Sequence, residues 1–235
     1  MIVHNRKTFF IFLSLIVCFV LFFSNSQTSP IQTHEFNNAD TAWMIVASAL
    51  VLLMTPGLAF FYGGMVSKKN VISTMLQSFI ALGIISLVWV LFGFSLAFGE
   101  TINGWGIIGN PFQYAFLNNL DSKNSNIPYL LFALFQLKFA IITPAIITGS
   151  FAERIRFRSY LLFMILFCIV IYCPLAHMTW AEDGLFANMG DILNLNGFEN
   201  LHVLDFAGGT VVHMSAGLAA LAGALYLGKR KTENT

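Results

Sequence analysis

The chain has 235 residues, of which 57% are hydrophobic and only 10% are charged, and it contains 25 phenylalanines. Soluble domains carry roughly a quarter charged residues, so this composition excludes an ordinary soluble protein and indicates a membrane protein. The formal net charge of +1 argues against nucleic acid as a partner.

Residues 1–26 have the pattern of a secretory signal peptide. Arg6 and Lys7 precede the apolar run 9–23, small polar residues offer a cleavage site, and the polar stretch 27–40 follows. We expect cleavage there, which leaves 27–40 as an extracytoplasmic N-terminal segment. The alternative is an uncleaved extra helix, because 15 apolar residues with their flanks could cross a thin membrane.

Five long apolar segments follow, each long enough to cross a bilayer as a helix. They run from about Trp43 to Tyr62, Val71 to Phe98, Tyr129 to Gly149, Ser159 to His177, and Val203 to Gly228. Thr55-Pro56-Gly57 interrupts the first, and the third contains Pro144 and one charge, Lys138. The predicted fold class is therefore all-α: a polytopic membrane protein with five transmembrane helices.

Basic residues gather in alternate loops between these segments. Eight of the twelve Lys and Arg residues fall on one side: Lys68, Lys69, Arg154, Arg156, Arg158, Lys229, Arg230 and Lys231. The other loops hold Glu100, Asp121, Glu182, Asp183, Asp191 and Glu199. The positive-inside rule places the basic side in the cytoplasm, with the mature N-terminus outside and the C-terminus inside. A cleaved signal peptide requires the same orientation.

The stretch from Asp205 to His213 opens the fifth segment with an acid and a histidine. Asp205 could cap the helix by accepting from the N–H groups of Ala207 and Gly208. In a regular helix His213 would lie roughly 12 Å deeper and roughly 80° around the axis. An ionisable group at this depth has a functional interpretation by default, but a histidine hydrogen-bonded between helices is equally open. Small residues dominate the rest of the segment, which predicts a helix central in a bundle.

Candidate aromatic residues lie within the third segment and at the outer boundary that follows the fourth. Phe135 and Phe139 are one helical turn apart on one face, and taken alone they are explained better by contact with lipid or core than by a site. Trp180 stands beside Glu182 and Asp183. Alone it is typical of an aromatic-belt anchor, but together the rings and acids would attract a cation.

No enzyme pattern competes with this interpretation. Gly93-Phe94-Ser95-Leu96 lacks the second glycine of an intramembrane serine protease motif, and we find no glycine-rich phosphate loop or metal-ligand pair. The three cysteines lie in apolar runs, where we expect buried small hydrophobes. We therefore expect a non-enzyme without a metal or another cofactor.

Taken in order, these residues resemble the Amt/Mep/Rh ammonium transporter family, the Amt branch in particular. Asp205–His213, with the small residues up to Gly228-Lys229-Arg230, resembles the family signature. Further matching motifs are Pro56-Gly57, Phe61-Tyr62-Gly63-Gly64, Lys69-Asn70-Val71, Phe94–Gly99, Phe135-Gln136, Phe139-Ala140, Ala152-Glu153-Arg154, Phe157, Pro174, Ala176-His177-Met178 and Trp180. The resemblance covers about Ala39 to Arg230.

The resemblance implies a role for each candidate residue. Trp180 and Phe135 would bind ammonium through their ring faces, and Phe135 and Phe139 would be stacked gate rings. Asp205 would stabilise the site structurally and electrostatically without touching the ion. His213 would be one of two histidines lining a hydrophobic pore, where ammonium gives up its proton and ammonia crosses. An apolar constriction penalises the bare cation, so this scheme is physically sensible.

The family fold has eleven helices, built as two inverted five-helix halves plus one more. This chain resembles the complete first repeat, with residues 41–230 as a partial transporter domain and 231–235 as a truncated cytoplasmic loop. The partner histidine and the second pore wall belong to the other half, so this chain alone would expose His213. The resemblance further implies ammonium and ammonia as substrates, a cell (inner or plasma) membrane location, a homotrimer, and a P-II type regulatory protein at the cytoplasmic face.

Lys138 departs from the resemblance, because its charge lies deep in the third segment and beside the gate positions. It would either repel ammonium or pair with an acid or carbonyl off the pathway. Two rival functions also stay open: an ammonium sensor whose Amt-like membrane domain feeds an output module, and a non-functional truncated remnant.

Overall fold

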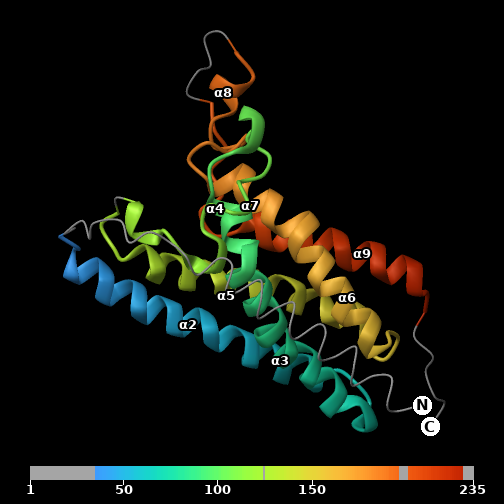
Figure 1. The fold of residues 1–235 in the computed structure, drawn as a ribbon. Helices are drawn as coiled ribbons and strands as arrows, with labels where there is room; N and C mark the ends of the chain where they lie inside the picture. Colours follow the sequence, from blue (N-terminus) through green and yellow to red (C-terminus); the bar gives the residue numbers. More distant parts are fainter. Residues whose placement is uncertain (1–34, 124, 196–200, 230–235) are drawn as a thin grey trace, which may run out of the picture. The chain divides into compact units, whose positions relative to one another are not determined.

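The computed structural model describes residues 35–123, 125–195 and 201–229. The predicted signal peptide, residues 1–26, lies outside them. Within the described residues, five helical stretches are long and apolar enough to cross a membrane, which confirms the predicted number. Their bounds are Asn38–Gly63, Lys68–Phe98, Tyr129–Phe151, Phe157–Trp180 and Gly209–Leu227. The predicted all-α polytopic fold class is therefore confirmed (Figure 1).

Three of these spans combine α-helix with a π-helical segment. The second contains α3 (Val71–Val88), a π segment at Trp89–Gly93, and α4 (Phe94–Phe98). The fourth contains α6 (Phe157–Phe167), a π segment at Cys168–Tyr172, and α7 (Cys173–Trp180). The fifth contains a π segment at Gly209–Met214 and α9 (Ser215–Leu227). Such widened turns recur at functional sites in helices, and no pattern in the sequence predicted them.

The remaining spans are single α-helices. α2 (Asn38–Gly63) begins five residues before the predicted start, because the Asn37 side chain accepts from the N–H groups of Ala39 (2.9 Å) and Asp40 (3.1 Å). It also continues through Pro56, so the predicted interruption at Thr55-Pro56-Gly57 is wrong. Proline is tolerated in transmembrane helices where the freed backbone groups find other partners. A short helix, α8 (Met189–Ile192), lies in the loop after the fourth span.

α5 (Tyr129–Phe151) holds the middle of the packing, since α2, α3 and α9 all contact it (Figure 1). Small residues along it, including Ala133, Ala140 and Ala145, are fully buried and let neighbouring backbones approach. The Tyr62 hydroxyl donates to the Ile146 carbonyl at 2.6 Å and so fastens α2 to α5. α5 also carries the aromatic positions of the candidate site.

Buried aromatic side chains join the second and fourth spans. Trp89 is almost fully buried, its Nε1 donates to the Ala133 carbonyl at 3.1 Å, and its ring lies 5.8 Å from that of Phe94 and 6.2 Å from that of Tyr172. Rings at these separations add stabilisation beyond the area they bury. This packing positions α4 against α7. The loop that follows each helix therefore starts close to the other.

The loop after α4 is tied to the loop after α7. The Asp183 carboxylate accepts from the Thr101 N–H at 2.5 Å, and the Gly106 carbonyl accepts from the Leu185 N–H at 2.8 Å. Gly106 has a φ of +65°, and a β-carbon there would collide with the backbone of the other loop. Glycine is therefore required at this close approach. The two loops together shape the outer side of the candidate site.

Candidate functional site

A cavity of about 420 Å³ lies where α5, the end of α7 and the loop before the fifth span meet. Its lining residues are Phe132, Phe135, Gln136, Phe139, Thr179, Trp180, Val203, Leu204, Asp205, Phe206, Ala207 and Gly208. Four of the five residues predicted for the site therefore lie around one space. The fifth, His213, does not line it. We call this space the aromatic cavity.

The rings of the aromatic cavity meet edge to face. The Phe135 and Phe139 centroids are 5.0 Å apart at 79° between planes, and the Phe139 and Trp180 centroids are 6.4 Å apart at 62°. The description of Phe135 and Phe139 as stacked rings is therefore wrong in geometry. Four residues along one helix bring two side chains to the same face, where the ring quadrupoles favour an edge-to-face contact.

Asp205 does cap the fifth span, but through partners further along the chain than predicted. Its Oδ2 accepts from the N–H groups of Thr210 and Val211, both at 3.0 Å, rather than from those of Ala207 and Gly208. The reason is that the helix begins at Gly209, after Gly208 has turned the chain with a φ of +75°. Asp205 thus stands outside the helix, and the predicted regular-helix spacing between Asp205 and His213 does not apply.

Trp180 is fastened to the same loop. Its indole Nε1 donates to the Asp205 carbonyl at 2.8 Å, which occupies the only polar atom of the side chain. The ring is partly buried and presents its carbon surface to the aromatic cavity. One hydrogen bond therefore fixes both the orientation of the ring and the position of the loop that carries the acid.

His213 lies in the π-helical segment and its side chain is exposed. α9 buries Ala216 at its start and packs against α5, while Leu218, Leu221, Leu225 and Tyr226 stay exposed. The prediction that this chain alone leaves His213 uncovered is confirmed. One face of α9 is packed and the other is open.

Lys138 is not among the residues that line the aromatic cavity. It projects from α5 between Phe135 and Phe139 in sequence and is partly buried. Within the part of the chain that the structure describes, its ammonium group makes no hydrogen bond or ion pair. The Lys138 charge therefore stands beside the cavity rather than in it.

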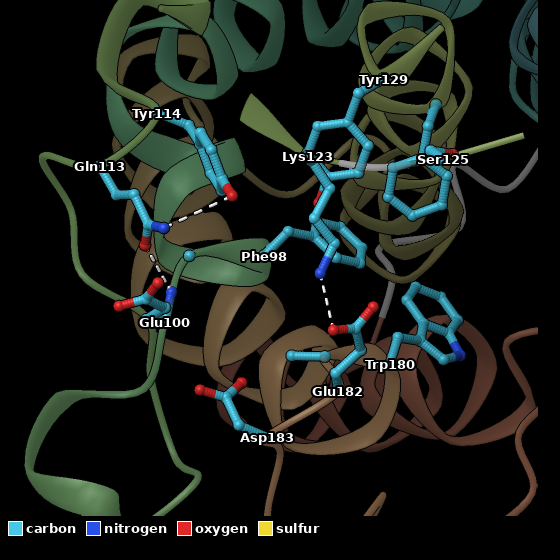
Figure 2. Close-up of a pocket in the computed structure, with 13 residues that line it drawn as sticks. Phe98, Glu100, Gln113, Tyr114, Lys123, Ser125, Tyr129, Trp180, Glu182 and Asp183 are labelled. Atoms are coloured by element: carbon cyan, nitrogen blue, oxygen red, sulfur yellow. Dashed lines mark hydrogen bonds and ion pairs between the residues drawn. The ribbon is translucent and has the colours of Figure 1, made fainter. Parts of the chain in front are cut away.

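A second cavity, of about 690 Å³ and drawn in Figure 2, shares Phe132 and Trp180 with the first. We call it the outer cavity. Three acids, Glu100, Glu182 and Asp183, face it, and Lys123 is the one basic residue in its described lining. Lys123 Nζ lies 2.6 Å from Glu182 Oε2. The described lining therefore carries a net charge of −2, from three carboxylates and one ammonium.

Tyr114 forms part of the outer cavity wall together with Tyr129. Burial raises the pKa of the Tyr114 phenol above its usual value, the nearby Lys123 opposes that shift, and the acids, Glu100 first, add to it. The phenol is therefore neutral at physiological pH. The charge of the outer cavity is set by the acids and the lysine.

Thr179 and Gln136 also line the aromatic cavity, and neither was predicted to have a role. Gln136 follows Phe135 within a motif of the family resemblance, so the motif itself was the available signal. Thr179 lies between Met178 and Trp180, beyond the predicted end of the fourth segment at His177. For Thr179, the available signal was its position directly before Trp180, a residue predicted for the site.

The sequence model of the Ammonium Transporter Family matches residues 42–235. The chain belongs to the ammonium transporter family. The ammonium transporter of Mycobacterium bovis is 45% identical over 213 residues, which are 83% of this chain and 43% of that protein. The chain thus spans less than half the length of the curated family members it matches.

Two solved structures of the family have the same fold. The crystal structure of Saccharomyces cerevisiae Mep2 aligns with a TM-score of 0.73 and 34% identity, covering 88% of this chain and 44% of that one. A solved Sensor Amt Protein aligns with a TM-score of 0.68 and 31% identity, covering 82% and 45%. The family membership inferred from the motifs is therefore confirmed, and so is the assignment as a multi-pass membrane protein.

Proposed function

We propose that this chain forms one wall of an ammonium-conducting path with a cation site in the aromatic cavity. The observation that carries the proposal is the meeting of Phe135, Phe139 and Trp180 with the Asp205 loop around one cavity. Ring faces attract a desolvated cation, and a nearby carboxylate adds to that attraction. Family membership makes ammonium the expected cation.

The path begins in the outer cavity. Its net negative charge raises the local concentration of cations, and the shared Trp180 and Phe132 lead from there into the aromatic cavity. Asp205 stabilises the cation through its field while its carboxylate oxygen stays bonded to the helix N-terminus. Phe135 and Phe139 act as the gate.

Beyond the gate ammonium loses its proton, and ammonia passes an apolar pore lined by His213. Crossing as the neutral species avoids much of the cost of a cation at membrane depth. The open face of α9 that carries His213 packs against the second half of the family fold, which supplies the partner histidine. Lys138 stands off this route, consistent with its place outside the cavity lining.

We further propose that the protein resides in the cell membrane with its basic loops in the cytoplasm. The loop lysines and arginines support that orientation. Because the chain belongs to the ammonium transporter family, we also propose that it forms a homotrimer and binds a P-II type regulator at its cytoplasmic face. A metal or other cofactor has no part in it.

An ammonium sensor is the second candidate, and the likeness to a solved Sensor Amt Protein favours it. The two functions share the outer site and differ in whether an output domain is joined to the membrane domain. Reading the gene beyond codon 235 distinguishes them, because a kinase or cyclase-like domain downstream would favour the sensor.

Growth on low ammonium tests the transport proposal directly. In cells that lack ammonium uptake, we expect rescue by this chain joined to the second five-helix half of a relative, and loss of rescue with Trp180→Leu. Failure of the joined protein, or full rescue by the Trp180→Leu variant, would refute the proposal. Rescue by the chain alone would refute the hypothesis that it is a non-functional truncated remnant.

A further inference from the structure

One lysine side chain reaches across the outer cavity. Lys123 follows the turn Leu120–Ser122, and its Nζ lies 2.6 Å from Oε2 of Glu182, which belongs to the loop after α7. Both residues line the cavity, and Figure 2 shows their side chains pointing toward each other. We call the Lys123 side chain bonded to Glu182 the lysine strap.

The lysine strap joins the two elements that border both cavities. Phe132 and Trp180 are the residues that the outer cavity and the aromatic cavity share. Glu182 follows Trp180 by two residues, and Lys123 precedes α5, the helix that carries Phe132. A cation that moves from the outer cavity toward the aromatic cavity therefore meets the stem and the ammonium group of Lys123.

The backbone at Lys123 is anchored, whereas one exposed contact holds its side chain. Leu120 is only 6% exposed, and its carbonyl accepts from the Lys123 N–H at 3.3 Å. The side chains of Lys123 and Glu182 are 33% and 82% exposed. Ion pairs at such exposure are weak, and the four-carbon stem of lysine is flexible. The side chain can therefore leave Glu182 while the fold stays unchanged.

Lys123 acts on an entering cation in two ways that can be separated. Its charge offsets part of the negative field of Glu100, Glu182 and Asp183, and that field acts alike on all cations of one charge. Its stem occupies space in the cavity, and that obstruction acts more on a large cation than on a small one. Only the second effect depends on the bond to Glu182.

We propose that the lysine strap restricts the entrance to the aromatic cavity and discriminates by size between ammonium and its alkylated homologues. Lys123 is then a specificity-determining residue, and it lies outside the motifs of the family resemblance. This inference rests on the proposed function and adds to it the step that admits the cation. The strap hinders methylammonium more than ammonium, because the methyl group widens the cation without changing its charge.

The test is the initial uptake of ammonium and, separately, of methylammonium by the joined protein, because entry can be measured only where the path is complete. Lys123→Ala removes the charge and the stem, and Glu182→Gln releases the stem. The first variant makes the cavity lining more negative and the second makes it less negative, so the field changes total uptake in opposite directions. The strap predicts the same change in both: the ratio of methylammonium to ammonium uptake rises about twofold to fivefold, the range that an exposed ion pair can supply.

Gln113→Glu is the matched control. Gln113 lines the same cavity, and glutamate keeps the oxygen that accepts from the Glu100 N–H at 2.6 Å. This variant adds one negative charge, the same change in net charge as Lys123→Ala, and leaves the strap in place. We expect higher uptake of both cations at low ionic strength and an unchanged ratio. An unfolding profile equal to that of the wild type shows that each variant is folded.

The outcomes separate the inference from the proposed function. An unchanged ratio in Lys123→Ala or in Glu182→Gln, or an equal rise in Gln113→Glu, would overturn the inference and leave Lys123 with its field alone. If Trp180→Leu still abolishes uptake in that case, the proposed function stands. Absence of uptake by the joined protein, or full uptake with Trp180→Leu, would overturn both.

Discussion

Replacing Asp205 separates its structural role from its electrostatic role. Asp205→Ala removes an oxygen that accepts two backbone N–H bonds of 3.0 Å at the start of the fifth span. Loss of a helix cap costs up to about 2 kcal/mol, and hydrogen bonds to a charged acceptor raise that figure. We expect the free energy of unfolding to fall by about 2–3 kcal/mol.

Asp205→Asn is the informative companion, since asparagine caps helices about as well as aspartate does. It keeps one acceptor oxygen and loses only the charge, so we expect a stability loss below about 1 kcal/mol from the helix dipole. The lost charge weakens cation binding: a carboxylate roughly 8 Å from an ion contributes about 2 kcal/mol at an effective dielectric constant of about 20. That corresponds to an affinity loss of more than tenfold.

The assays are unfolding by SDS titration in mixed micelles and calorimetric titration with ammonium. We predict that the alanine variant is unstable and binds weakly, whereas the asparagine variant is stable and binds weakly. If both variants lost the same stability, the capping geometry would not be the source of it. If the asparagine variant bound ammonium as tightly as the wild type, the electrostatic role of Asp205 would be refuted.

Three further perturbations test other parts of the molecule. Tyr160→Phe should lower the free energy of unfolding by about 1–3 kcal/mol, because it leaves the buried Thr148 hydroxyl without its 2.6 Å partner. Adding Thr148→Val should recover part of that loss in the same unfolding assay. If the losses of the two single variants simply added in the double variant, the pairing of the two hydroxyls would be contradicted. Gly208→Ala should lower the free energy of unfolding by about 1–2 kcal/mol or more, since the positive φ disfavours a β-carbon that would also lie 2.8 Å from Val212 Cγ2. If this variant were as stable as the wild type, the turn geometry at Gly208 would be contradicted. Lys123→Met should lower the half-saturating ammonium concentration for uptake by the joined protein at low ionic strength, with the effect shrinking as salt is added; an unchanged value would argue against the outer cavity as a cation collector.

Much of the fold could be predicted because the bilayer dictates the length and apolarity of each span. Positions of helix ends depended on finer signals. Asn37 extends α2 outward, and the helix continues through Pro56, which transmembrane helices tolerate where the freed backbone groups find other partners. The π segments had no visible signal, since hydrophobic periodicity assumes a regular α-helix throughout.

The candidate site was predictable in its residues and not in its geometry. The family motifs pointed to Phe135, Phe139, Trp180 and Asp205, and these residues do surround one cavity. The true partners of Asp205 depended on the turn at Gly208, which moved the helix start beyond the expected position.

The most direct test of the cation site is the ammonium binding isotherm of the purified chain compared with that of the Trp180→Leu variant. Removing one ring from a desolvated cation site forfeits about 2 kcal/mol or more, so we predict saturable binding by the wild type and binding at least about tenfold weaker by the variant. Identical isotherms for the two proteins would contradict the assignment of the aromatic cavity as the ammonium site.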